Sequence, residues 1–328
     1  MTSSPMTDLA VEVHGLRRRY AGHGRGPNTG FEAVRGLDLQ IRRGELYALL
    51  GTNGAGKTSS LEVIEGLARP TAGSVRLLGH DPYAERDRIR PRIGIMLQEA
   101  GFPGALTVTE LADTWHRLLT DPRPVGEVLE QVGLSHRRAV AIESLSGGEQ
   151  RRLDLALAIM GRPEVIFLDE TTTGLDPQSR RTTWELIQGL LAEQTSVVLT
   201  THYLEEAELL ADRIGIMHEG RIVREGTLSE ILERQPSRIS FAVATDADLT
   251  SLATFAGAGL HTEQQVDERR VRLETYDPQR VLGVLLSWAG ETIQLSDLRV
   301  EPGSLEQAFL EVAASGVDQS ETSMEMIA

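Results

Sequence analysis

Residues 51–58 read Gly-Thr-Asn-Gly-Ala-Gly-Lys-Thr and follow the phosphate-binding pattern G-x-x-x-x-G-K-[ST] at every fixed position. Glycines have no Cβ, so the backbone can turn tightly and direct successive N–H groups toward an anion. Lys57 is the only lysine in a chain with 33 basic residues, and its compact ammonium fits between phosphates better than the wide fork of arginine. We expect Lys57 to contact the β- and γ-phosphates of a nucleotide and the Thr58 hydroxyl to bind Mg²⁺. The predicted binding segment consists of Gly51, Thr52, Asn53, Gly54, Ala55, Gly56, Lys57, Thr58 and Ser59.

Two carboxylates follow the apolar run Val165–Leu168, which is typical of a buried strand. Asp169 could hold Mg²⁺ through its water shell, and Glu170 could polarise a water for attack on the γ-phosphate. The alternative is a solvated acidic turn after a strand. The position of this pair downstream of the glycine loop favours metal-assisted hydrolysis.

A second possible anion site precedes the predicted helix over residues 151–160. Ser146, Gly147 and Gly148 lie at its start, where helix N–H groups are free to bind an anion. In the simpler interpretation, Ser146 caps the helix and the glycines are flexible. A second phosphate site in one domain is redundant unless it serves the nucleotide of a neighbouring molecule.

Strands and helices alternate along the part of the chain that carries these residues. Apolar runs at 45–50, 74–78, 93–97, 165–168, 196–200 and 214–217 predict strands, and apolar spacing predicts helices from Thr58 and over 180–192. This alternation predicts an α/β fold with a mostly parallel sheet, preceded by strands at 11–20 and 31–41. Helical spacing over 108–119 and 125–132 predicts a helical insertion between two strands.

The character of the chain changes near residue 235. We expect a P-loop domain over 8–235 with a helical subdomain at about 101–160, a small α+β domain over 236–314, and a disordered acidic tail over 315–328. Predicted strands at 237–245, 261–265, 271–275 and 292–300 alternate with helices at 247–256 and 278–288. The order β-α-β-β-α-β resembles a ferredoxin-like domain.

Composition excludes several classes of function. The 328 residues include 48 acidic and 33 basic ones, a formal net charge of −15, whereas nucleic-acid and lipid surfaces need clustered positive charge. The lack of cysteine excludes disulfides and thiolate metal sites. Neither a signal peptide nor 18 consecutive apolar residues are apparent, so we expect a soluble cytoplasmic protein that relies on another chain for any membrane part.

Taken together, the motifs resemble the nucleotide-binding subunit of an ABC transporter over about residues 10 to 235. The resemblance is carried by the Walker A loop at 51–58, the Q-loop at Gln98, the signature motif at 145–150, the Walker B strand at 165–170, the D-loop around Asp176 and the switch His202. The single nucleotide domain and the segment Ser304–Glu311 resemble bacterial drug-resistance exporter ATPases of the daunorubicin type. Thr52 and Thr171 stand where the family often has proline, and we expect small effects on loop stiffness.

The resemblance implies a role for each site residue. Two copies would pack head to tail, with ATP between the Walker A loop of one and Ser146, Gly147 and Gly148 of the other. Glu170, His202 and Gln98 would be catalytic, and Thr58, Gln98 and Asp169 would hold Mg²⁺. Asp176 would lie at the nucleotide interface. Tyr20 would stack on adenine, with Phe31 as the alternative.

The implied function is ATP hydrolysis that energises export of a small hydrophobic compound or drug. The export path would be a separate integral-membrane permease, which would hold the homodimer on the inner face of the cell membrane. The alternative is a soluble ABC-type ATPase that acts on a macromolecular machine such as the ribosome, which the single nucleotide domain and the acidity disfavour. The C-terminal domain would add dimer surface or bind a small regulatory ligand, and we favour dimer surface.

Overall fold

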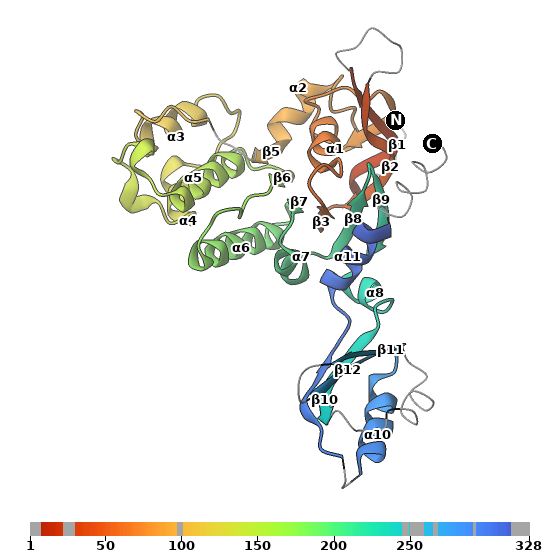
Figure 1. Ribbon diagram of the computed structural model, residues 1–328. Helices are drawn as coiled ribbons and strands as arrows, with labels where there is room; N and C mark the ends of the chain where they lie inside the picture. The colour runs from red at the N-terminus through yellow and green to blue at the C-terminus, as the bar shows by residue number, and fades with distance from the viewer. Residues whose placement is uncertain are drawn as a thin grey trace. The chain divides into compact units, whose positions relative to one another are not determined.

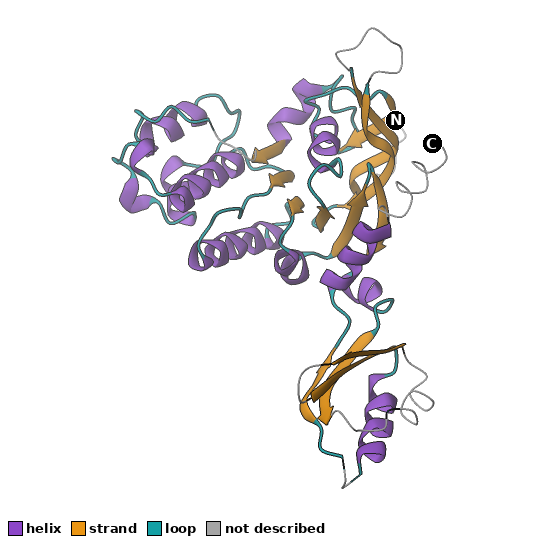
Figure 2. Cartoon of the chain, viewed as in Figure 1, coloured by secondary structure: helices purple, strands orange, loops and turns teal. Residues whose placement is uncertain are grey.

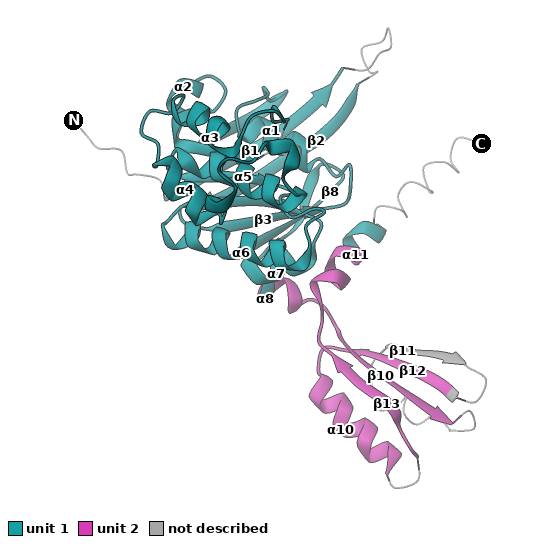
Figure 3. Ribbon diagram, turned by 90° about the vertical axis from the view of Figure 1, so that its left-hand side faces the viewer, with its two compact units in different colours: residues 1–228, 312–328 teal, residues 229–311 magenta. Residues whose placement is uncertain are grey.

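The computed structural model describes residues 8–21, 30–96, 101–244, 249, 259–264, 268–290 and 293–315. The chain divides into two compact units, residues 1–228 with 312–328 and residues 229–311 (Figure 3). No helix among the described residues is long and apolar enough to cross a membrane.

A six-stranded sheet forms the centre of the first unit. Its strands are β3 (Leu46–Gly51), β5 (Ile93–Met96), β6 (Val165–Asp169), β7 (Ser196–Thr201), β8 (Arg213–His218) and β9 (Arg221–Gly226). They lie in the order β5-β6-β7-β3-β8-β9, and every pair is parallel except β8 with β9. Strands β3, β6 and β7 are buried along their whole length, as expected for a sheet covered on both faces. The mostly parallel sheet predicted from the sequence is therefore confirmed.

A three-stranded antiparallel sheet in the order β2-β1-β4 packs against one side of this centre. It consists of β1 (Leu9–Tyr20), β2 (Phe31–Arg42) and β4 (Ala72–Leu77). Helix α1 (Lys57–Ile64) shares a hydrophobic core with both sheets, and its Leu61 and Ile64 are buried with Leu37 of β2 and Phe167 of β6. This packing fixes the helix that follows the glycine loop.

The predicted helical insertion is present (Figures 1 and 2). It contains α3 (Val108–His116), α4 (Val125–Gln131) and α5 (Gly147–Met160), with short 3₁₀ turns at Ser135–Arg137 and Ile142–Ser144. Helix α3 ends before the predicted residue 119, and Leu118 is exposed. Helix α5 begins four residues before the predicted start because Ser146 and Glu149 form a capping box.

Two helices, α6 (Pro177–Ala192) and α7 (Leu204–Leu210), cover the central sheet from the other side: α6 packs on β7, and α7 on β3 and β7. Strand β9 and helix α7 were not predicted. Strand β9 alternates exposed residues such as Arg221 and Glu225 with half-buried ones, a pattern that suits a charged edge strand.

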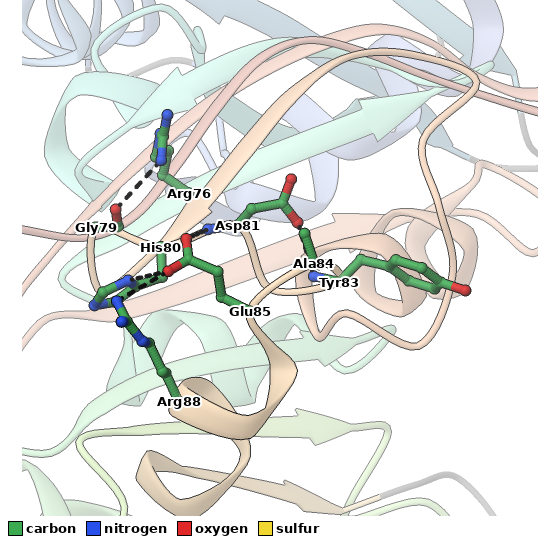
Figure 4. A network of polar contacts seen from close by, with 8 residues as sticks. All are labelled: Arg76, Gly79, His80, Asp81, Tyr83, Ala84, Glu85 and Arg88. Carbon is green, nitrogen blue, oxygen red and sulfur yellow. Dashed lines mark hydrogen bonds and ion pairs between the residues drawn. The ribbon is translucent and has the colours of Figure 1, made fainter.

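A polar network orders the turn that leads from β4 to α2 (Arg86–Ile89) and its 3₁₀ extension Arg90–Arg92 (Figure 4). The Glu85 carboxylate lies 3.0 Å from Nδ1 of His80 and accepts a bond of 3.2 Å from Arg88. These contacts hold the pKa of Glu85 below its ordinary value, with the hydrogen bond to His80 as the largest cause. The network lies at the start of α2, and the chain continues through the 3₁₀ turn into β5, which ends at Met96.

The second unit contains a four-stranded antiparallel sheet in the order β11-β12-β10-β13. The elements are β10 (Ser237–Ala244), β11 (Gly259–Gln264), β12 (Glu268–Thr275), α10 (Pro278–Ala289) and β13 (Ser296–Glu301), with α8 (Leu228–Leu232) and α11 (Leu305–Ser315) at the two boundaries of the unit. Helix α10 buries Val281 and Leu285 against Phe241 of β10 and Val271 of β12. The strand order agrees with the predicted ferredoxin-like arrangement. The predicted helix at 247–256 lies outside the described residues, apart from Leu249.

Candidate nucleotide-binding and hydrolysis site

The glycine loop connects the end of β3 to the start of α1. Gly56 has a φ of 104°, and a Cβ there would lie 2.3 Å from the carbonyl oxygen of Ala33. A Cβ on Gly51 would lie 2.7 Å from the carbonyl oxygen of Met217. Only glycine therefore fits at these two positions. Asn53, Gly54 and Thr58 are exposed, with Thr52 and Ser59 half-buried beside them, so the outer side of the loop is accessible to a ligand.

Lys57 lies back across the loop. Its Nζ donates to the carbonyl oxygens of Gly51, at 2.7 Å, and Thr52, at 3.4 Å, and the residue is only 6% exposed. Burial lowers the pKa of Lys57, while the charges of Glu170 and Asp169 oppose that change. A buried ammonium is costly without an anion, so a bound phosphate would relieve the cost.

We expect Lys57→Arg to lower ATP hydrolysis by about 10²-fold or more, since loss of one well-placed donor to the transition state has that effect. Lys57 is buried, and its Nζ lies 2.7 Å from the Gly51 oxygen, so the longer and wider guanidinium would have to displace its neighbours. The measurement is steady-state ATPase activity, with the melting temperature as a check on folding. Turnover near the wild-type rate would contradict the role assigned to Lys57.

The two strand-end carboxylates lie beside Lys57. The Thr200 hydroxyl on the neighbouring strand β7 donates to Asp169. Burial raises the pKa of Asp169, the charge of Glu170 adds to this, and Thr200, Lys57 and Thr58 oppose it. Asp169 and Thr58 are oxygen donors of the kind that Mg²⁺ prefers. No group of three or more His, Cys, Asp or Glu suited to a metal occurs in the described part of the chain, so a Mg²⁺ here would need further ligands besides Thr58 and Asp169.

Glu170 faces His202. Its Oε2 lies 3.6 Å from Nδ1 of His202, in the turn between β7 and α7. The Glu170 side chain is 14% exposed and that of His202 is 40% exposed, so both can reach a ligand at the surface. A carboxylate beside an imidazole can orient a water and hold its proton.

The predicted second anion site lies at the N-terminus of α5. Ser146 caps this helix: its hydroxyl accepts from the Glu149 amide, and the Glu149 carboxylate accepts from the Ser146 amide at 2.8 Å. Gly147 is exposed and has nothing within 4 Å of an added Cβ, whereas a Cβ on Gly148 would lie 2.8 Å from Oγ of Ser179. The capping role and the anion-binding role are compatible, because the cap leaves the amides of Gly147 and Gly148 unbonded by the Ser146 side chain.

Asp176 caps α6. Its carboxylate accepts from the amides of Gln178 and Ser179, each at 3.0 Å, and from the Ser179 hydroxyl at 2.6 Å. The Ser179 hydroxyl therefore binds Asp176 and also lies next to Gly148, 2.8 Å from where a Cβ of that residue would be. The start of α5 and the start of α6 are adjacent as a result.

Tyr20 lies beside the glycine loop. Its hydroxyl oxygen lies 3.1 Å from the Ser59 hydroxyl and 3.0 Å from the Glu62 carboxylate, so it can donate its one proton to either. The Arg18 guanidinium covers its ring at 4.7 Å from the centroid. Phe31 pairs with Tyr20 across β1 and β2 and is 61% exposed. Adenine stacking by either ring stays a prediction. Gln98 lies outside the described residues.

Sequence reasoning gave no role to two buried carboxylates near the site. Glu65, at the end of α1, is 5% exposed, and burial, with the charges of Asp169 and Glu62, raises its pKa to about 8. Glu206 of α7 accepts from Thr172 at 3.2 Å and from Trp184 at 3.1 Å, and burial raises its pKa. Each is one acidic residue in a helix, so its burial could not be read from the sequence.

A glycine loop with a buried lysine, two strand-end carboxylates and a histidine defines the class of protein: a P-loop nucleotide hydrolase. Residues 34–173 match the family described as ABC transporter, and residues 237–304 match the family described as ABC transporter domain-containing protein-like, C-terminal domain. The chain belongs to the ABC transporter family and is an ATP-binding ATPase.

Relatives of known name match nearly the whole chain. The daunorubicin/doxorubicin resistance ATP-binding protein of Streptomyces peucetius is 33% identical, over 95% of each chain. The Nod factor export ATP-binding protein of Ralstonia nicotianae is 34% identical, over 92% of each chain. The dimeric structure of a bacterial ABC transporter cassette is 25% identical, with a TM-score of 0.59 over 66% of this chain and 98% of that one.

Proposed function

We propose that this protein hydrolyses ATP to energise export of a small hydrophobic compound or drug through a separate membrane permease, to whose cytoplasmic side it binds. One observation carries the ATPase part. The charges of Asp169 and Glu170, at the end of β6, act on the Lys57 ammonium, and Oε2 of Glu170 lies 3.6 Å from Nδ1 of His202. The export part is supported by relatives whose names state drug resistance or export. These relatives are named after different compounds, although their sequences are about equally identical to this chain. The permease, rather than this chain, would therefore determine the substrate.

The active form in this proposal is a head-to-tail homodimer. The second anion site at Ser146 and Gly147 lies on α5, not on the loop that carries Lys57, and a dimeric structure exists for a similar cassette. Each ATP would lie between the glycine loop of one chain and Ser146–Gly148 of the other. Thr58, Asp169 and Gln98 would hold Mg²⁺, which would supply positive charge to the phosphate oxygens.

Capture of a partner tests this function. The tagged chain is expressed in its own host, membranes are solubilised in mild detergent, and proteins that co-purify are identified. We expect a multi-spanning membrane protein in stoichiometric amount, and higher ATPase activity when both are reconstituted into liposomes. Lys57→Arg is the control for activity without loss of capture. Co-sedimentation with ribosomes and no membrane protein would favour the alternative, an ATPase of a macromolecular machine.

A further inference from the structure

Helix α5 contacts the hydrolysis site through a residue that the sequence motifs do not single out. Arg151 lies one turn beyond the Ser146 cap, and its Nη2 donates to the backbone carbonyl of Glu170 at 3.4 Å. The Arg151 side chain is 15% exposed, so this bond is largely shielded from water. The same helix therefore presents an anion-binding end and a donor to the chain at Glu170.

The backbone of Glu170 needs such support. Its φ is 48°, in the left-handed region that residues other than glycine rarely adopt. On one side its amide donates to the Thr200 carbonyl at 3.1 Å and contacts the Thr200 hydroxyl at 3.2 Å. On the other side its carbonyl accepts from Arg151 and from the Thr173 amide at 3.3 Å. Arg151 is thus a long-range contact, among the described residues, on the carbonyl side of Glu170.

Asp154, one turn further along α5, pairs with Arg151: Oδ2 lies 3.7 Å from Nη1. Asp154 is only 8% exposed. Burial raises its pKa to about 6, and Arg151, the charged group that faces it, opposes the rise. A carboxyl whose pKa is raised on folding favours the neutral form, so its ionisation lowers stability as the pH rises from about 4 through about 6. At neutral pH the folded protein therefore contains an ionised Asp154, whose buried charge lowers the stability of the fold.

We propose that Arg151 and Asp154 form a positioning pair that couples the Ser146–Gly148 end of α5 to the backbone of Glu170 in the same chain. This rests on the proposed dimer, in which that end of α5 binds one ATP and Glu170 acts on the other. When a nucleotide engages the helix end, movement of α5 changes the support of Glu170 through Arg151. The pair then links the two ATP sites across one protomer.

Steady-state kinetics of Arg151→Ala, Arg151→Lys and Asp154→Asn test the pair. For Arg151→Ala we expect kcat to fall about tenfold, as for loss of roughly one hydrogen bond to a charged group, with KM for ATP changed less than twofold and the Hill coefficient for ATP lowered toward one. Arg151→Lys should restore part of kcat, because lysine can still donate one bond. The matched control is Arg123→Ala, which removes an arginine of similar burial, 11% exposed, that pairs with Glu193 away from the site.

Asp154→Asn separates positioning from a merely structural role. It should lower kcat several-fold at pH 8 while the melting temperature at pH 8 stays equal or rises, because the buried charge is gone. The difference in kcat from wild type should shrink as the pH falls through about 6. A lower melting temperature with unchanged kcat would overturn the assignment of Asp154.

Two further outcomes are decisive. If Arg151→Ala has the same kcat and the same Hill coefficient as Arg123→Ala, the proposal that Arg151 and Asp154 form a positioning pair is wrong. If the wild-type protein hydrolyses ATP as a monomer, the proposed dimer fails, and coupling between sites fails with it. A loss of kcat in Arg151→Ala would in that case still show that Arg151 positions Glu170.

Discussion

Replacement of Glu170 by glutamine is expected to lower kcat by about 10² to 10⁴, the usual contribution of a group that positions and deprotonates a water. ATP binding should persist, because Lys57 and the glycine loop are unchanged. Glutamine keeps the shape of the side chain beside His202, 3.6 Å away in the wild type, but it cannot take a proton. The variant should therefore accumulate a dimer with ATP bound, measured by size-exclusion chromatography with ATP and Mg²⁺.

The control for this experiment is Glu185→Gln, the same chemical change on the exposed surface of α6. It should leave kcat and the elution volume unchanged. A Glu170→Gln protein that binds ATP and elutes only as a monomer would contradict the proposed dimer, and one that keeps wild-type kcat would contradict the role of Glu170.

Gly147→Asp is expected to abolish hydrolysis while leaving ATP affinity nearly unchanged. Nothing lies within 4 Å of an added Cβ at Gly147, so the carboxylate would extend from the chain without disturbing it, whereas at Gly148 it would meet Ser179. In the proposed dimer the new charge faces the γ-phosphate of the partner's ATP. Like charges a few ångströms apart in a partly dry interface cost several kcal/mol, so the dimer should not close.

A mixture of Gly147→Asp chains with Lys57→Ala chains tests action between chains. Their heterodimer combines the intact glycine loop of the first chain with the intact Ser146–Gly148 segment of the second, so one of its two sites is complete. We expect one occluded ATP per heterodimer and none with either variant alone. Gly189→Asp, at an equally open and exposed glycine of α6, should behave as wild type. Loss of ATP binding by Gly147→Asp as complete as in Lys57→Ala would show that Gly147 serves its own chain's nucleotide.

The sequence by itself determined the features that depend on local chemistry. The glycine loop can be predicted from the sequence because only glycine fits at positions 51 and 56, where a Cβ would lie 2.7 or 2.3 Å from a backbone oxygen. The loop conformation therefore requires glycine at these two positions. Strands β3, β6 and β7 are readable because they are apolar throughout, as burial on both faces requires. The start of α5 could also have been placed correctly, since Ser146 and Glu149 form the S-x-x-E pattern of a capping box.

Only the tertiary structure decided which distant residues meet. Glu170 and His202 face each other because β6 and β7 are neighbours in the sheet, and strand order is set by packing rather than by local sequence. Arg151 reaches the carbonyl of Glu170 for the same kind of reason: α5 is packed beside the sheet in this unit. The burial of Asp154 and Glu206 likewise follows from the three-dimensional arrangement. Such contacts depend on long-range packing, which residue spacing along a single chain does not specify.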